Sequence, residues 1–190
     1  MRLIAILLLD KMESWDDADE MIFFMSVDGT HFRIPEPRPW STIWSSHNGG
    51  GKAAVNFEIG LSISRPKLLW LYGPTPPGAM NDLDVAREHL IPAVWQYDGR
   101  KRVMADGIYS AQEFADVFST KNPFDPVEMA NFKNRVAARH EAFNGLLKCW
   151  KVLGEKFPLE CDFHVEAVLV ITCCQLDNNS YSLFDAYPVY

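Results

Sequence analysis

Residues 21–34 read Met-Ile-Phe-Phe-Met-Ser-Val-Asp-Gly-Thr-His-Phe-Arg-Ile, an apolar run into which Asp28-Gly29-Thr30-His31 is inserted. A short apolar run of this kind, bounded by turn residues, is typical of a buried strand. Three prolines between 35 and 39 then interrupt regular structure. A carboxylate beside a buried strand costs free energy unless it is paired or binds a cation. The stretch therefore predicts a buried strand that delivers Asp28 to a functional site.

The segments that follow predict two more strands. Residues 54–63 and 67–72 are apolar and are joined by the short turn Ser64-Arg65-Pro66, while residues 48–52 form a Gly-rich turn ahead of them. Tight connections between strands are typical of antiparallel pairing. Residues 21–72 are therefore predicted to form an antiparallel meander of three strands.

The second half of the chain alternates helix signals with one short strand. Its expected elements are a helix capped by Asn81 or Asp82 and ending near Leu90, a strand over 101–105, a helix capped by Ser110, a long helix from Pro126 to about Phe157, and a last helix over 163–176. Three antiparallel strands, a helix, a strand and further helices follow the order of an RNase H-like fold. We therefore predict an α/β protein with a mixed sheet, the meander plus a parallel strand, flanked by helices.

Three acidic residues occupy positions suited to a catalytic site. Asp28 and Asp106 each end an apolar strand and precede a glycine, and Glu141 lies in the long helix. At about 100° per residue, the large apolar side chains of that helix lie opposite Glu141, whereas Asn144 and Lys148 share its side. An exposed glutamate on an amphipathic helix is the alternative interpretation of Glu141.

Composition restricts the range of functions. The net charge of −7 argues against nucleic acid as a partner, but the acidic excess is concentrated in residues 1–30, whereas residues 133–156 are rich in Lys and Arg. The four cysteines form no CxxC pair and lack zinc-finger spacing, and Cys173 and Cys174 are expected to be buried thiols in a reducing, intracellular compartment. No apolar run reaches the roughly 18 residues of a membrane span.

Four short motifs occur in one order along the chain. They are Asp28-Gly29-Thr30-His31, Pro77-Gly78-Ala79-Met80-Asn81-Asp82, Ala105-Asp106-Gly107-Ile108-Tyr109 and the segment RHEAFNGLLK of residues 139–148. Together they resemble the catalytic-domain motifs of Harbinger-type (PIF/Harbinger) DDE transposases, over about residues 21–178. The separation of 35 residues between Asp106 and Glu141 is similar to that of such enzymes.

The resemblance implies a metal-dependent DNA endonuclease or transposase that acts in the nucleus. Asp28, Asp106 and Glu141 would be the catalytic triad and would hold Mg²⁺ or Mn²⁺, because hard oxygen ligands favour these ions. Secondary expectations are that Asp82 is a rival metal ligand, that His31 supports the ligands, and that Lys133, Arg139, Lys148 and Lys151 contact DNA phosphates.

The sequence departs from the family pattern in two places. Ile108 replaces the glycine that precedes the tyrosine, and only about 27 residues, with an excess of negative charge, stand where the family carries a helical DNA-binding region. We therefore expect an acidic, poorly ordered segment over 1–20, a catalytic domain over 21–178 and a tail over 179–190. A separate DNA-binding partner protein is expected, and an oligomer is left open. The alternative is a domesticated or degenerate DDE fold that binds DNA or a partner protein without catalysis.

Overall fold

The computed structural model describes residues 4–7, 23–46, 50–63, 66–97, 102–157 and 161–177. The strands are β1 (Ile4–Leu7), β2 (Phe23–Arg33), β3 (Ala54–Ser62), β4 (Leu68–Thr75), β5 (Arg102–Met104) and β6 (Phe118–Ser119). The helices are α1 (Asp82–Val85), continued by a π-helical turn η3 (Ala86–Leu90) and α2 (Ile91–Tyr97), then α3 (Val127–Cys149), α4 (Lys151–Gly154) and α5 (Cys161–Asp177). Short 3-10 turns lie at η1 (Thr42–Trp44), η4 (Gly107–Tyr109) and η5 (Gln112–Phe114).

These strands form one mixed sheet in the order β1-β4-β3-β2-β5-β6. The pairs β1–β4, β4–β3 and β3–β2 are antiparallel, whereas β2–β5 and β5–β6 are parallel. The predicted meander and the predicted parallel strand are both confirmed, as is the RNase H-like α/β class. Strand β2, which carries the opening sequence stretch, lies between the antiparallel and the parallel halves.

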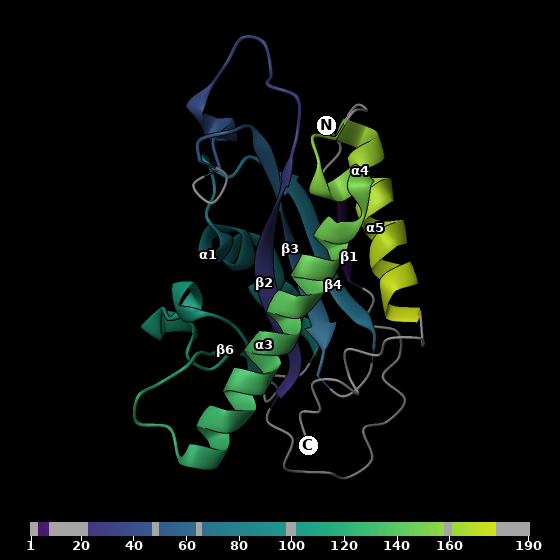
Figure 1. The fold of residues 1–190 in the computed structure, drawn as a ribbon. Helices are drawn as coiled ribbons and strands as arrows, with labels where there is room; N and C mark the ends of the chain where they lie inside the picture. The colour runs from purple at the N-terminus through teal and green to yellow at the C-terminus, as the bar shows by residue number, and fades with distance from the viewer. Residues whose placement is uncertain are drawn as a thin grey trace.

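Helices cover both faces of this sheet (Figure 1). Successive side chains of a strand point to opposite faces, and the two faces have separate cores. On one face Phe57 and Ile59 of β3 belong to a cluster with Phe143 of α3 and residues of α5. On the other face Met25 and Trp70 belong to a cluster with residues of α1, η3 and α2.

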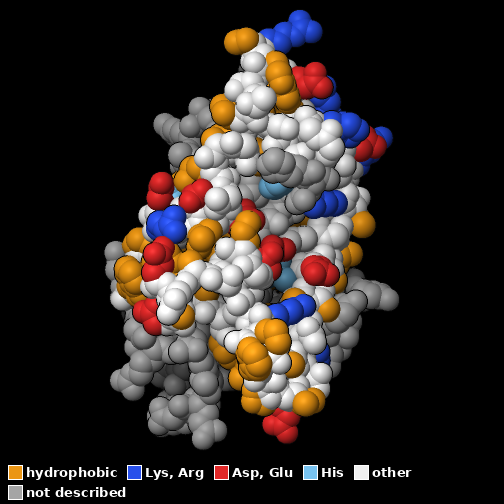
Figure 2. Space-filling view, turned by 90° about the vertical axis from the view of Figure 1, so that its left-hand side faces the viewer, with side chains coloured by type: hydrophobic (Ala, Val, Ile, Leu, Met, Phe, Trp, Pro, Cys, Tyr) orange, Lys and Arg blue, Asp and Glu red, His pale blue; other side chains and the backbone are white. Residues whose placement is uncertain are grey.

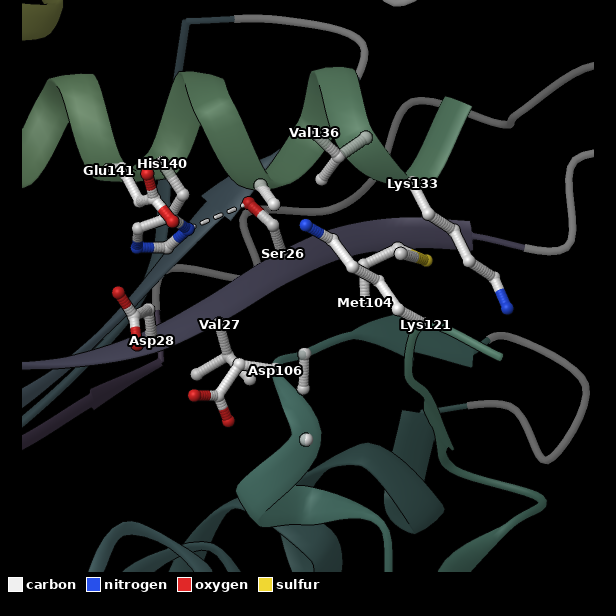
Figure 3. Close-up of a pocket in the computed structure, with 13 residues that line it drawn as sticks. Ser26, Val27, Asp28, Met104, Asp106, Lys121, Lys133, Val136, His140 and Glu141 are labelled. Atoms are coloured by element: carbon white, nitrogen blue, oxygen red, sulfur yellow. Dashed lines mark hydrogen bonds between the residues drawn. The ribbon is translucent and has the colours of Figure 1, made fainter. Parts of the chain in front are cut away.

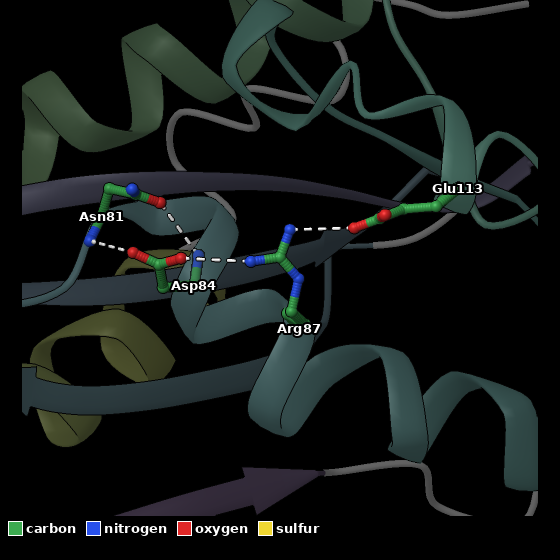
Figure 4. Close-up of polar contacts among 4 residues, drawn as sticks. All are labelled: Asn81, Asp84, Arg87 and Glu113. Carbon is green, nitrogen blue, oxygen red and sulfur yellow. Dashed lines mark hydrogen bonds and ion pairs between the residues drawn. The ribbon is translucent and has the colours of Figure 1, made fainter.

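A capping box fixes the start of α1. The Asn81 side chain accepts from the backbone N–H of Asp84 at 2.9 Å, and the Asp84 carboxylate accepts from the backbone N–H of Asn81 at 3.3 Å. Arg87 then pairs with Asp84 at 3.3 Å and with Glu113 at 2.9 Å, which ties this helix to η5 (Figure 4). Of the two predicted caps, Asn81 is the one used, and the Asp82 side chain is left for another contact.

Three sequence expectations are wrong. Ser110 does not cap the start of a helix, because its hydroxyl donates to the Gly107 carbonyl at the end of the 3-10 turn η4. The long helix ends at Cys149, because Trp150 has an extended backbone (φ −71°, ψ 117°) that separates α3 from α4. Cys174 is exposed and Cys173 is half-buried, since α5 packs on the sheet along one side only.

The sheet extends ahead of residue 21, where the sequence placed the start of the domain. Strand β1 pairs Ile4 with Gly73 and Leu7 with Trp70 of β4. The rest of the expected acidic segment and the expected tail over 179–190 lie outside the described residues. Among the described residues, no helix has the length and apolar character that a membrane crossing requires.

Candidate active site

A pocket of about 160 Å³ lies between β2, the end of β5 and α3 (Figure 3). Asp28, Asp106 and Glu141 all line it. The remaining lining side chains include Ser26, Lys121, Lys133 and His140. The structure thus brings the three predicted carboxylates, which come from three separate elements, to one cavity.

The parallel pairing of β2 and β5 accounts for two of the three carboxylates. This ladder pairs Ser26 with Met104, and Asp28 and Asp106 each follow two residues later. Because β2 and β5 run in the same direction and are paired in register, Asp28 and Asp106 lie at the same end of the two strands. Helix α3 packs across β2 and brings Glu141 to the same place. In Figure 2 acidic side chains gather around a hollow in this face of the molecule.

Asp28 has the most perturbed carboxyl group of the pocket. Burial raises its pKa to about 7, and the charges of Asp106, Asp82 and Glu141 add to the rise, while the Gly29 backbone N–H opposes it. A carboxyl group disfavoured in its charged form by burial and like charges is typical of functional sites. The pocket therefore concentrates negative potential that a bound cation would relieve.

Two polar contacts hold α3 against β2 at this pocket. Asn144 donates from Nδ2 to Asp28 Oδ2 at 2.9 Å. His140 Nδ1 lies 2.9 Å from Ser26 Oγ, and burial together with the Arg139 charge lowers the pKa of His140 to about 3. His140 is therefore neutral near pH 7. The helical wheel had placed Asn144 beside Glu141, but no sequence signal singled out His140 or Ser26.

The turn that follows Asp106 aims that residue. The Asp106 side chain accepts from the backbone N–H of Ile108 at 2.9 Å and so caps η4. Ile108, the departure from the family motif, has a half-exposed side chain and leaves this turn intact. Gly107 has open space where a Cβ would stand, so the shifted glycine is not required by packing.

Tyr109, at the end of the same turn, is anchored to a buried acid of β3. Its hydroxyl donates to Glu58 Oε1 at 2.9 Å, and Trp70 Nε1 donates to Glu58 Oε2 at 2.7 Å. Burial raises the pKa of Glu58 to about 8 against the opposing effect of these two donors. Sequence reasoning missed Glu58, although a single acid inside the apolar run of residues 54–63 is a signal for a buried partner.

Asp82, the predicted rival ligand, does not line the pocket. Its Oδ1 accepts from Asn56 Nδ2 at 2.7 Å, and a Cβ at Gly29 would overlap its carboxylate. Burial raises the Asp82 pKa, and its charge contributes to the raised pKa of Asp28. Asp82 is thus a neighbour of Asp28 across β2, and Gly29 gives it the room to approach.

Two of the four predicted DNA-contact residues are buried. Arg139 is 1 % exposed and donates to the carbonyls of Ser62 and Ile63 at 3.0 and 2.9 Å, so its prediction as a phosphate contact is wrong. Lys133 lines the pocket, but its ammonium is buried and pairs with Asp125 at 2.8 Å. A helical wheel gives direction only and does not show which surfaces another element covers.

The other predicted contacts lie elsewhere. Lys148 and Lys151 are exposed, and Lys148 borders a second cavity rather than the pocket of the three carboxylates. His31 also lines that second cavity, and its Nδ1 lies 2.7 Å from Ser46 Oγ. His31 therefore lies at the second cavity, and its charge also opposes the raised pKa of Asp82.

The donor set of the pocket suits a hard divalent cation. Its three carboxylates offer only oxygen ligands, which Mg²⁺ and Mn²⁺ prefer, and burial, followed by the charges of the neighbouring acids, raises the pKa of Asp28. Within the part of the chain that the structure describes, however, no three acidic, histidine or cysteine side chains stand close enough to hold an ion together. The pocket has the oxygen ligands that a divalent cation prefers, and the three side chains would have to move closer together to coordinate one ion.

Comparison with known proteins agrees with this arrangement. A family model described as DDE superfamily endonuclease matches residues 27–178, a range that spans β2 to α5 and includes all three pocket carboxylates. No curated protein and no solved structure was found to match the chain. Because the match covers well over half of the sequence, the chain belongs to the DDE superfamily endonucleases and carries a DDE transposase domain.

Proposed function

We propose that this protein is a metal-dependent DNA endonuclease core of the Harbinger type, in which Asp28, Asp106 and Glu141 form the catalytic triad. The observation that carries the proposal is that these residues, from β2, the end of β5 and α3, line one pocket. The family supports a nuclease that acts on DNA. The four motifs of the sequence support the Harbinger subtype.

The reaction is the cleavage of a phosphodiester bond. A water oxygen bonds to phosphorus while one P–O bond breaks, and in transposition a DNA 3′-hydroxyl would be the second nucleophile. Mg²⁺ or Mn²⁺ held by the three carboxylates would stabilise the charge on the attacking and leaving oxygens. Asp28 acts in its deprotonated form, and Asn144 orients it by donating to Oδ2.

Other pocket residues suit the handling of a phosphate. Lys121 lines the pocket and is exposed, so its ammonium can approach a non-bridging phosphate oxygen. Neutral His140 places a ring nitrogen at the pocket without adding charge. In Figure 3 the Asp28 carboxylate stands between those of Glu141 and Asp106.

One observation favours the second candidate function, a DDE fold that binds DNA or a partner protein without cutting. Among the described residues the acids do not already form a group able to hold an ion. A decayed site would keep the three carboxylates but would hold them too far apart to bind one ion together. The two functions differ in whether added metal produces cleavage.

The deciding experiment is cleavage of supercoiled plasmid DNA with Mg²⁺ or Mn²⁺ and with EDTA. Asp28→Asn, Asp106→Asn and Glu141→Gln should each abolish nicking. Asp116→Asn and Glu128→Gln are matched controls, because both residues are exposed acids and Glu128 lies on the same helix as Glu141. Wild-type protein that leaves DNA intact with both ions would reject the nuclease and leave the binding function.

A further inference from the structure

A second cavity, of about 220 Å³, is lined by the residues of β2 that follow Asp28, whereas the carboxylate pocket is lined by Asp28 and the two residues before it. Gly29, the residue after Asp28, lines it, as do Leu153 and Gly154 of α4. The two cavities are therefore consecutive along β2.

The second cavity has the opposite charge. Arg33, Lys52 and Lys148 line it together with His31, and none of its lining residues in the described part of the chain is acidic. Within those same ranges, no carboxylate forms a salt bridge with any of the three cations. Three exposed cations that form no described salt bridge attract an anion.

The later part of β2, which lines this cavity, has an unpaired edge in the described structure. The parallel ladder of β2 with β5 stops at Ser26 and Met104, so in the described structure only β3 pairs with the later part of β2. Thr30 and Ser46 add hydroxyl groups to the wall, and the buried Thr30 hydroxyl has no hydrogen-bond partner among the described residues. The cavity thus combines positive charge with polar groups, which is the chemistry that binds a phosphate.

The position of the second cavity relative to the three acids suggests which DNA phosphate it would bind. Lys148 lies seven residues after Glu141 on α3, which corresponds to about 10 Å along the helix axis. Asp28 is close enough to Lys148 for its charge to oppose the lowering of that lysine's pKa by burial. A strand that places one phosphate against the three acids would carry a nearby phosphate into the cationic cavity.

We propose that the cavity lined by His31, Arg33, Lys52 and Lys148 binds a DNA backbone phosphate next to the one to be cleaved. The proposal rests on the proposed nuclease function for the identity of the ligand. The site holds the strand by charge and carries no base recognition, so it fixes the register of the backbone over the acids.

The test measures binding of a fluorescein-labelled DNA duplex to the full chain by anisotropy, in EDTA, across a series of salt concentrations. Arg33→Ala, Lys52→Ala and Lys148→Ala should each weaken binding and reduce the slope of log affinity against log salt by about one. Lys52→Arg should retain the wild-type slope. Lys67→Ala is the matched control, since Lys67 is exposed on the turn between β3 and β4, away from the cavity.

The outcomes separate this site from the nuclease itself. The phosphate site is overturned, and the nuclease function stands, in one case. In that case the wild type cleaves DNA, and all three alanine variants keep the melting temperature, the DNA affinity and the salt slope of the wild type. Weaker binding by those variants in a protein that never cuts would support the site and reject catalysis. Variants that lose affinity for poly-glutamate but not for DNA would overturn the proposal in favour of an acidic protein partner.

Discussion

Asn144 on α3 donates a 2.9 Å hydrogen bond to Asp28 on β2, so the helix that carries Glu141 also holds the central acid of the pocket. The bond occupies Oδ2 and fixes the orientation of the carboxylate. It also links two of the three elements that form the site, which makes Asn144 a positioning residue.

Asn144→Ala should remove this link. A hydrogen bond to a charged group contributes about 1.5–3 kcal/mol, so the free energy of unfolding in urea should fall by roughly that amount. Metal-dependent cleavage should also fall, because Asp28 becomes free to rotate away. Asn134→Ala is the control on the same helix, since Asn134 is exposed. A variant with the stability and cleavage rate of the wild type would show that the bond does not position Asp28.

Asp28 should make stability depend on pH in the absence of metal. Folding raises its pKa from 3.8 to about 7 through burial and the neighbouring acids, so the folded protein keeps a proton that the unfolded chain loses in this window. Its contribution to stability is therefore largest below pH 3.8 and is lost as pH rises through 7, by at most about 1.4 kcal/mol per pH unit. In EDTA, Asp28→Asn should gain stability relative to wild type between pH 5 and 7.5. A difference in unfolding free energy between Asp28→Asn and the wild type that stays constant across this pH range would contradict the raised pKa of Asp28.

The same substitution should remove metal binding without loss of the fold. Calorimetry with Mn²⁺ is the measurement, because the ligand set loses a charge when Asp28 becomes Asn. Binding by the wild type should weaken below pH 7, where a proton competes with the ion for Asp28. Asp116→Asn should bind as the wild type does. Equal Mn²⁺ affinity in Asp28→Asn would remove Asp28 from the ligand set.

Asp106 and Asp82 should differ in their effect on cleavage. Asp106→Ala should abolish it, because Asp106 lines the pocket. Asp82→Ala should reduce it modestly, because Asp82 lies outside the pocket and its carboxylate bonds to Asn56 at 2.7 Å. Plasmid nicking rates with Mg²⁺ provide the comparison. The reverse order of effects would place Asp82 in the triad instead of Asp106.

Tyr109→Phe should destabilise the protein and weaken cleavage. The Glu58 oxygen that accepts from Tyr109 would lose its donor inside the core, which costs about 1–3 kcal/mol. The turn that aims Asp106 would lose its anchor at the same time. Urea unfolding and nicking rates are the measurements. An unchanged nicking rate in a destabilised variant would show that the anchor serves folding alone.

The sequence by itself predicted strands β2 to β5 and the placement of the three acids on their elements. Apolar runs bounded by glycine and proline predicted β2, β3, β4 and β5, because strand signals are local. The positions of Asp28 and Asp106 after strands, and of Glu141 on the polar side of a helix, follow from the same local patterns. The predicted parallel pairing of the two strands also implies that Asp28 and Asp106 end side by side.

Only the tertiary structure decided which polar side chains are covered and which partners they find. Arg139 and Glu141 are two residues apart, yet Arg139 is buried against the end of β3 and Glu141 opens onto the pocket. Asp82 reaches Gly29, Asn144 reaches Asp28, and Lys52 and Lys148 share a cavity, all across long sequence separations. Burial and pairing depend on which surfaces of different elements face each other, and local periodicity carries no information about that.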